Sequence, residues 1–123
     1  MAGDKKIIKG NNMIGVDIEK IERFKNLTQK ELKRIFTDTE LEYVFSFNEP
    51  YSHIGGMWCV KEAVIKALKN KSIPLKKIEV LHDENGAPFI NKEKLNKYLS
   101  NYSYIDISIS HSDTDVVAVV QII

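Results

Sequence analysis

The chain has 123 residues, a length that suits one domain with one hydrophobic core. Its 18 Lys and Arg residues nearly balance 17 Asp and Glu residues, so net charge gives no reason to expect a nucleic-acid or membrane partner. No stretch reaches the ~18 apolar residues of a membrane span. The single cysteine, Cys59, cannot form a disulfide within the chain, which favours a reducing, cytoplasmic setting.

Folded structure is predicted to begin at Met13. Residues 1–12 are polar and end in a Gly-Asn-Asn loop composition, so we expect a flexible extension, either natural or left over from how the protein was made. Residues 13–123 show no repeat or linker and are predicted to form one domain.

Residues 13–18 alternate with period 2 and predict a short strand. Gly15 and Asp17 share one face of it, and the glycine leaves room for another group to approach beside the carboxylate. Asp17 could equally cap a short helix expected over residues 19–25. The next helices are predicted over residues 27–35, with Thr28 as the cap, and over residues 38–47. Thr37 and Glu40 have the spacing of a capping box for the latter.

Residues 51–68 predict a long central helix with a broad apolar arc, which is typical of a buried helix. Glu62 and Lys66 lie beyond one edge of the arc at the i, i+4 spacing, where an exposed ion pair is the commonest interpretation. Lys61 lies within the arc. Because an unpaired buried ammonium is costly, Lys61 must either extend to water or meet an anion.

The rest of the chain predicts a terminal set of strands. Residues 78–81 and 87–90 form a hairpin around an Asn-Gly turn, a helix covers residues 92–99, and strands cover residues 105–110 and 116–122. A strand, several helices, a hairpin, a helix and a strand pair predict an α+β fold with a small, mostly antiparallel sheet.

Two carboxylates on separate elements, Asp17 and Glu62, could hold one Mg²⁺ ion beside phosphates. Lys61, Lys66 and His111 are side chains suited to a phosphate-rich ligand. His111 could also simply close the turn after its strand.

Five segments resemble the bacterial holo-[acyl-carrier-protein] synthases, the small class of 4′-phosphopantetheinyl transferases. They are GVDI at residues 15–18 with Arg23 downstream, FTDTEL at 36–41, WCVKEAVIKAL at 58–68, NGAPFI at 85–90 and SISHS at 108–112. They occur in the family's order, at about its spacing, and cover nearly everything from Met13 to the C-terminus.

The resemblance implies a compact α+β unit, with a small sheet packed on a long central helix, that forms a homotrimer with active sites between subunits. It implies transfer of 4′-phosphopantetheine from coenzyme A to a serine of apo acyl carrier protein, with release of adenosine 3′,5′-bisphosphate. It implies Mg²⁺ bound by Asp17 and Glu62, and a position on the carrier-docking helix for Arg23. The residues it places near coenzyme A are Lys61, Lys66, Gly86, Pro88, Ser110 and His111.

For the catalytic roles, Glu62 is the first candidate for the base that takes the serine proton and His111 is the second, with Asp17 as the other metal ligand. Two positions depart from the family. Met57 stands where the family commonly has Arg, and Lys69 stands where a glycine often follows, so the central helix is expected to run further here. The alternative function is a non-catalytic module that binds phosphate or a carrier protein.

Overall fold

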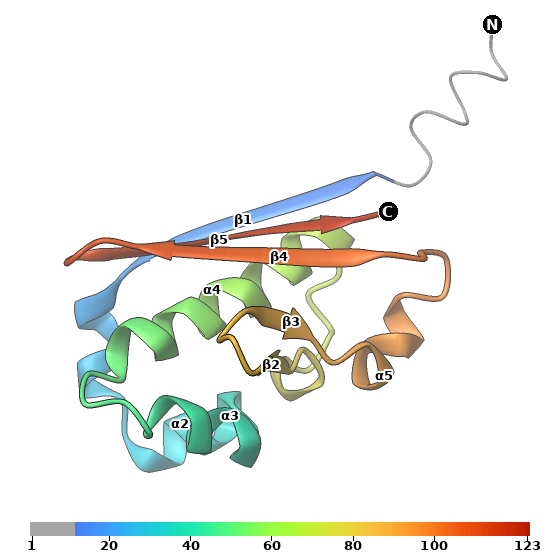
Figure 1. Ribbon diagram of the computed structural model, residues 1–123. Helices are drawn as coiled ribbons and strands as arrows, with labels where there is room; N and C mark the ends of the chain where they lie inside the picture. Colours follow the sequence, from blue (N-terminus) through green and yellow to red (C-terminus); the bar gives the residue numbers. More distant parts are fainter. Residues whose placement is uncertain (1–11) are drawn as a thin grey trace, which may run out of the picture.

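The computed structural model of the chain describes residues 12–123, and the extension expected over residues 1–12 lies outside them except for Asn12. A three-stranded antiparallel sheet covers one side of a long helix, and the smaller elements lie on the other side of that helix (Figure 1). This is the α+β fold with a small antiparallel sheet that the sequence predicts. That residues 13–123 form a single domain stays a prediction. No helix within residues 12–123 combines the length and the apolar character needed to cross a membrane.

The elements occur in an order close to the expected one. They are β1 (Met13–Lys20), η1 (Ile21–Asn26), α2 (Gln29–Ile35), α3 (Asp38–Val44), α4 (Tyr51–Leu68), η2 (Leu75–Lys77), β2 (Val80–His82), β3 (Pro88–Ile90), α5 (Lys92–Leu95), η3 (Asn96–Tyr98), β4 (Ile105–His111) and β5 (Asp115–Ile122). Four predictions differ from the structure. The helix expected over residues 19–25 is the 3-10 helix η1, which begins at Ile21 because β1 continues to Lys20. The helix expected to reach residue 47 ends at Val44, the helix over residues 92–99 is divided into α5 and η3, and the strand expected over residues 78–81 is Val80–His82.

The cap at the start of α3 has the predicted geometry. The Thr37 hydroxyl accepts a hydrogen bond from the Glu40 amide at 3.2 Å, and the Glu40 carboxylate accepts one from the Thr37 amide at 2.9 Å. Thr28 caps α2 in the same reciprocal way with Glu31. Each box satisfies donors that a helix start otherwise leaves unpaired.

The sheet has the strand order β1-β5-β4, and its inner face packs on α4. Strand β1 and helix α4 are in close backbone contact at Gly15, since a Cβ atom built there would lie 1.8 Å from the Ala63 carbonyl oxygen. Asp17 lies on the same buried face and pairs in register with Ala118 of β5. The expectation that Gly15 admits a close neighbour beside Asp17 is confirmed.

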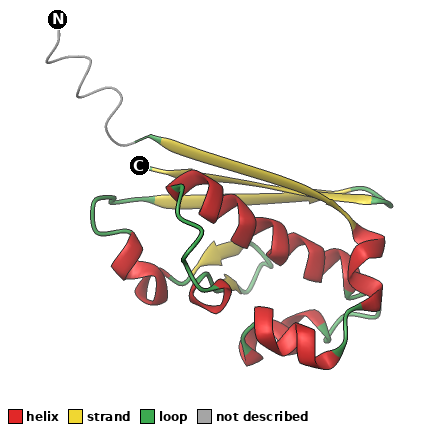
Figure 2. Cartoon of the chain, turned by 180° about the vertical axis from the view of Figure 1, so that it is seen from behind, coloured by secondary structure: helices red, strands yellow, loops and turns green. Residues whose placement is uncertain are grey.

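The outer face of β1 and β5 is apolar and exposed. Ile14 is 69% exposed, Val16 51% and Ile18 64%, and the cross-strand neighbour of Val16 is Val119, which is 44% exposed. The back view shows this face lying away from every helix (Figure 2). Its apolar character is therefore unused by the core of the chain.

Helix α4 crosses the sheet, so its two halves face different strands. A Cβ atom on Gly56 would lie 3.0 Å from Ile109 of β4, whereas Ala63, further along the helix, meets Gly15 of β1. The helix ends at Leu68 because Lys69 takes up the left-handed backbone conformation, with φ 53° and ψ 40°. The expectation that α4 runs beyond this point is wrong, because Lys69 adopts the strained conformation that a glycine would adopt freely.

We expect Lys69→Gly to raise the free energy of unfolding by roughly 0.5–1 kcal/mol, since it removes the left-handed strain but adds chain entropy to the unfolded state. Urea denaturation measures the change. Lys33→Gly, within helix α2, is the matched control and should lower the free energy of unfolding. A loss of stability in Lys69→Gly would contradict the cap assignment.

Candidate functional site

Asp17 of β1 and Glu62 of α4 meet at the seam that Gly15 opens between strand and helix. Asp17 is 8% exposed, and its Oδ1 accepts a hydrogen bond from Lys66 Nζ at 2.9 Å. Its Oδ2 is buried and has no hydrogen-bond partner among residues 12–123. Lys66 Nζ also donates to the Val16 carbonyl at 3.0 Å, so the exposed lysine is held over the carboxylate.

The seam carries more negative than positive charge. Burial raises the pKa of Glu62 above its usual range, and the charge of Asp17 raises it further, while Lys66 opposes the change. The pKa of Lys66 is raised, and the largest cause is its hydrogen bond to Asp17. Cys59 lies beside this charge, and burial together with Asp17 raises the pKa of its thiol to about 12. Cys59 is therefore a buried thiol without nucleophilic character, as expected from its place in the helix.

Arg23 of η1 lies next to the same seam. Its guanidinium forms an ion pair with Glu19 at 2.9 Å and lies 4.8 Å from the centroid of the Trp58 ring. The side chain is 48% exposed, so it is oriented by its neighbours and still reaches solvent.

Lys61 is not available to bind coenzyme A, although the family resemblance implies that it does. Its side chain is fully buried, and Nζ donates to Glu40 Oε1 at 2.9 Å, to the Leu75 carbonyl at 2.9 Å and to the Ile78 carbonyl at 2.8 Å. An ammonium group has three donors, so none is left for a phosphate and none reaches water. The assignment of Lys61 to coenzyme A is wrong, because its anion is Glu40 of α3.

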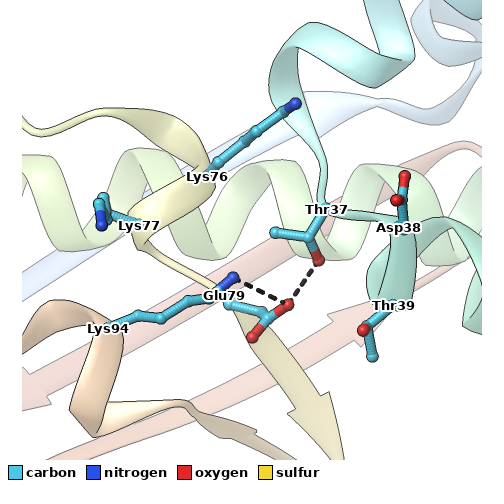
Figure 3. A pocket seen from close by; sticks show the side chains of 7 residues that line it. All are labelled: Thr37, Asp38, Thr39, Lys76, Lys77, Glu79 and Lys94. Carbon is cyan, nitrogen blue, oxygen red and sulfur yellow. Dashed lines mark hydrogen bonds and ion pairs between the residues drawn. The ribbon is translucent and has the colours of Figure 1, made fainter.

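The Lys61–Glu40 pair belongs to a polar network that reaches the surface. Thr37, the cap of α3, donates its hydroxyl to Glu79 Oε2 at 2.6 Å, and Lys94 of α5 lies 3.5 Å from the same oxygen (Figure 3). Thr37, Glu79 and Lys94 line a cavity of about 430 Å³, and none of the predicted site residues lies in its wall. The network ties α3, α5 and β2 to the buried side of α4, and we assign it a structural role.

Gly86, Pro88 and His111, three of the predicted coenzyme A residues, line one cavity of about 160 Å³. Gly86 has φ +83° at the tip of the hairpin, which explains the glycine there. His53 of α4 and His82 of β2 line the same cavity and are not among the residues that the sequence suggested. Their only sequence signal is that the chain has three histidines in all.

The predicted site is divided into two groups within the chain. Ser110 lies with Ile18 in a second hollow of about 250 Å³ at one end of the sheet, lined by residues of all three strands, and His111 lines both this hollow and the histidine cavity. Asp17, Glu62 and Lys66 line neither this hollow nor the histidine cavity. His53 and Glu62 lie about two and a half turns apart on α4, so their side chains point to opposite sides of the helix.

Comparison with known proteins assigns the chain to a family. Residues 13–120 match the model of the 4′-phosphopantetheinyl transferase superfamily. The chain is 41% identical over 114 residues to the holo-[acyl-carrier-protein] synthase of Thermodesulfovibrio yellowstonii, which covers 89% of this chain and 96% of that protein. It is 44% identical over 113 residues to a holo-[acyl-carrier-protein] synthase of Clostridium botulinum, covering 85% of this chain and 91% of that protein.

Solved structures agree with these sequence matches. The holo-[acyl-carrier-protein] synthase of Helicobacter pylori in complex with coenzyme A has a TM-score of 0.76 and 30% identity, over 89% of this chain and 99% of that one. The Neisseria meningitidis enzyme has a TM-score of 0.79 and 27% identity, over 89% and 96% of the two chains. The chain therefore belongs to the 4′-phosphopantetheinyl transferase superfamily and, within it, to the holo-[acyl-carrier-protein] synthase family. It is a transferase, and the family predicted from its motifs is confirmed.

Lys61→Met should lower the free energy of unfolding by about 3–5 kcal/mol, because it leaves the carboxylate of Glu40 buried without its ion-pair partner. The double variant Lys61→Met/Glu40→Gln should recover part of that loss, since the buried charge is then gone. Urea denaturation measures both, with Lys77→Met, an exposed lysine, as the control expected within about 0.5 kcal/mol of the parent. A Lys61→Met variant of unchanged stability that bound coenzyme A weakly would restore the original assignment.

Proposed function

We propose that the protein transfers the 4′-phosphopantetheine group of coenzyme A to a serine hydroxyl of apo acyl carrier protein and releases adenosine 3′,5′-bisphosphate. The observation that carries the proposal is the Asp17–Glu62–Lys66 group, in which a buried carboxylate oxygen of Asp17 has no hydrogen-bond partner in the described part of the chain. The relatives named above are synthases of this kind, and one of them is described in complex with coenzyme A.

Asp17 and Glu62 suit a magnesium ion, and we propose them as its ligands. The donor set is two carboxylates, which is the chemistry that a hard cation prefers. Oδ2 of Asp17 has no hydrogen-bond partner within residues 12–123, and the pKa of Glu62 is raised by burial and, second, by the charge of Asp17, so the two carboxylates repel each other. Within residues 12–123 no group of three or more His, Cys, Asp and Glu side chains could enclose a metal, so water and substrate oxygens would complete the coordination. When bound, Mg²⁺ supplies positive charge at the pyrophosphate.

The side chains of the seam then perform the proton and charge steps. The serine oxygen attacks the β-phosphorus of coenzyme A, and the bond between that phosphorus and the oxygen leading to the α-phosphate breaks. Glu62 is the first candidate for the base that accepts the serine proton. Lys66 offers positive charge to the phosphates.

On the other side of α4, we propose that His111, Ser110, Gly86 and Pro88 contact coenzyme A. His111 remains the second candidate for the base, and we favour it as a phosphate contact. The contact of its Nδ1 with the Ser112 carbonyl at 3.1 Å favours a proton on Nδ1 and leaves Nε2 for a ligand.

Arg23 is our proposal for the contact with the acidic carrier protein. Its ion pair with Glu19 and its position over Trp58 hold the guanidinium at the rim of the seam, within reach of solvent. A charge placed there acts mainly on the rate of encounter with an oppositely charged partner. We also propose a cytoplasmic location, supported by the free thiol of Cys59.

We further propose that the protein is a homotrimer. The homotrimer is implied by the family resemblance, and two observations are consistent with it. Nothing within residues 12–123 covers the exposed apolar face of β1 and β5, and an interface between copies would bury it. The two groups of site residues lie on opposite sides of α4, so a neighbouring copy could supply the second group to the seam of the first.

Asp17→Asn and Glu62→Gln should each reduce pantetheine transfer by at least about 100-fold, since each removes charge stabilisation of several kcal/mol at the pyrophosphate. Mass spectrometry of apo carrier protein incubated with coenzyme A and Mg²⁺ measures the transfer. Removal of metal with a chelator should stop the reaction of the parent protein, and added Mg²⁺ should restore it. Glu22→Gln, an exposed carboxylate, is the matched control. A Glu62→Gln variant that transfers at the parent rate would show that the seam is not the reaction centre. A parent protein that binds coenzyme A but transfers no pantetheine would favour the non-catalytic module.

Val16→Lys should reduce the trimer to monomers, because it places a charge at the centre of the apolar outer face, across from Val119. Light scattering after size exclusion should give three chain masses for the parent at micromolar concentration and one for the variant. Gln29→Lys, at the exposed start of α2, adds the same charge elsewhere and should leave the mass unchanged. A parent protein that elutes as a monomer would overturn the proposal.

A further inference from the structure

The 160 Å³ cavity beside the first half of α4 holds all three histidines of the chain, His53, His82 and His111. The rest of its wall carries no charged side chain, and Met57, which stands where the family commonly has Arg, is part of that wall. Any charge that this cavity offers to a ligand must therefore come from imidazole groups.

The rings of His53 and His82 are held in place by their faces. His82 stacks on Tyr43 with 3.7 Å between ring centroids and an interplanar angle of 6°. His53 stacks on Phe47 at 3.8 Å and 15°, and Tyr43 meets both Phe47 and His53 edge-on. The stacking fixes both rings and uses their faces, so only the nitrogen edges remain for a polar ligand.

The nitrogens of His53 and His82 have no protein partner among residues 12–123. The buried side-chain polar atoms without a partner in that range are Asp17 Oδ2 and Trp58 Nε1, so the ring nitrogens are instead accessible to solvent. No cluster in the same range has three His, Cys, Asp or Glu side chains placed to hold a metal. A fixed, open imidazole edge can bind an anion as a donor from each protonated nitrogen.

The charged groups around the two rings come from several elements. Glu49, before α4, raises the pKa of His53 and His111 of β4 lowers it, but burial is the largest cause and lowers it overall. For His82 burial again lowers the pKa, His53 adds to the lowering and Asp83, after β2, opposes it. Glu42 of α3 lines the adjoining cavity on the other side of His82. The pKa of each ring is thus lowered overall in the free protein.

We propose that His53 and His82 form a proton-linked phosphate contact, in which a phosphate group entering the cavity is held by ring N–H donors and the rings take up protons from solvent as it binds. The inference rests on the proposed function, because coenzyme A is the phosphate ester in question. The group could be the 3′-phosphate or the pyrophosphate, which share this chemistry. No proton is transferred to the substrate in this step, and the protons return to solvent when the product leaves.

The sign of the pH dependence follows from linkage. The phosphate raises the pKa of a ring from its low value in the free protein toward a higher one in the complex. Affinity therefore increases as pH falls through the bound pKa, and the gain is complete below the free pKa. Each pH unit by which the ligand raises a pKa strengthens binding to the protonated form about tenfold.

The direct test is a titration of the three imidazoles of the full chain by NMR, in the free protein and with adenosine 3′,5′-bisphosphate, coenzyme A or dephospho-coenzyme A at millimolar concentration. At least one of His53 and His82 should show a pKa raised by about one pH unit or more on binding. If dephospho-coenzyme A does not raise it, the 3′-phosphate is the group bound, and if it raises it equally, the group is the pyrophosphate. Ligands that leave the pKa values of both rings unchanged would overturn the proposal.

Variants supply a second readout. The dissociation constant of coenzyme A for His53→Gln/His82→Gln, divided by that of the parent, should be about tenfold larger at pH 6 than at pH 8. Comparison at equal pH cancels the ionisation of the ligand itself. Lys77→Gln, which removes a positive charge from the separate Thr37–Glu79 cavity, should give the same ratio at both pH values. A flat ratio for the double histidine variant would count against the inference.

The transfer assay at pH 8 separates this inference from the proposed function. Transfer in the parent with unmoved histidine pKa values would leave the function standing and defeat the proton-linked contact. Raised histidine pKa values without transfer would support the phosphate contact and defeat the function. Failure of both measurements would defeat both.

Discussion

The backbone contact between β1 and α4 is the constraint on which the site depends. A side chain at residue 15 would overlap the Ala63 carbonyl, so only glycine lets the strand lie against the helix there. Asp17 is two residues further along the same face of β1, and Glu62 precedes Ala63, so the contact that buries Gly15 also brings the two carboxylates together. Burial and repulsion by Asp17 raise the pKa of Glu62, and Oδ2 of Asp17 has no hydrogen-bond partner among residues 12–123. The chain therefore maintains an electrostatically unfavourable seam that Lys66 relieves only in part, which is the condition for binding a cation.

Much of this arrangement could be predicted from local patterns. Period-2 alternation placed Gly15 and Asp17 on one face of a strand, and helical periodicity gave α4 from Tyr51 to Leu68. Lys61 shows where such reasoning stops. The apolar arc left two outcomes for its side chain, extension to water or contact with an anion. It could not identify that anion as Glu40, 21 positions earlier in the chain, or the two carbonyls of the segment after α4 that complete its bonds. A helical wheel describes one helix, whereas the residues that pack against that helix are determined by the tertiary structure.

His53 and His82 show the same limit, because sequence patterns did not identify them as site residues. Gly86, Pro88 and His111 were identified through motifs, whereas His53 and His82 lie on positions with no motif of their own. They are brought into the cavity by Tyr43 and Phe47, whose rings stack on them, and those rings come from α3 and the turn after it. Lys69 is a further case, because a backbone conformation forced by the end of α4 is not visible in the residue type that adopts it.

The direction of α4 has a consequence for how the two groups of residues can act on one substrate. The histidine cavity and the carboxylate seam lie on different sides of this helix, and no helix within residues 12–123 covers the apolar outer face of the sheet. A ligand with phosphates at both ends of a nucleotide needs charge at two separated places. One chain offers the carboxylates, with Lys66, at one place and the imidazoles at the other. An assembly that covers the outer face of one copy with another would bury the exposed Ile14, Val16 and Ile18. The burial that holds such an assembly together could then also be what brings the two halves of the site together.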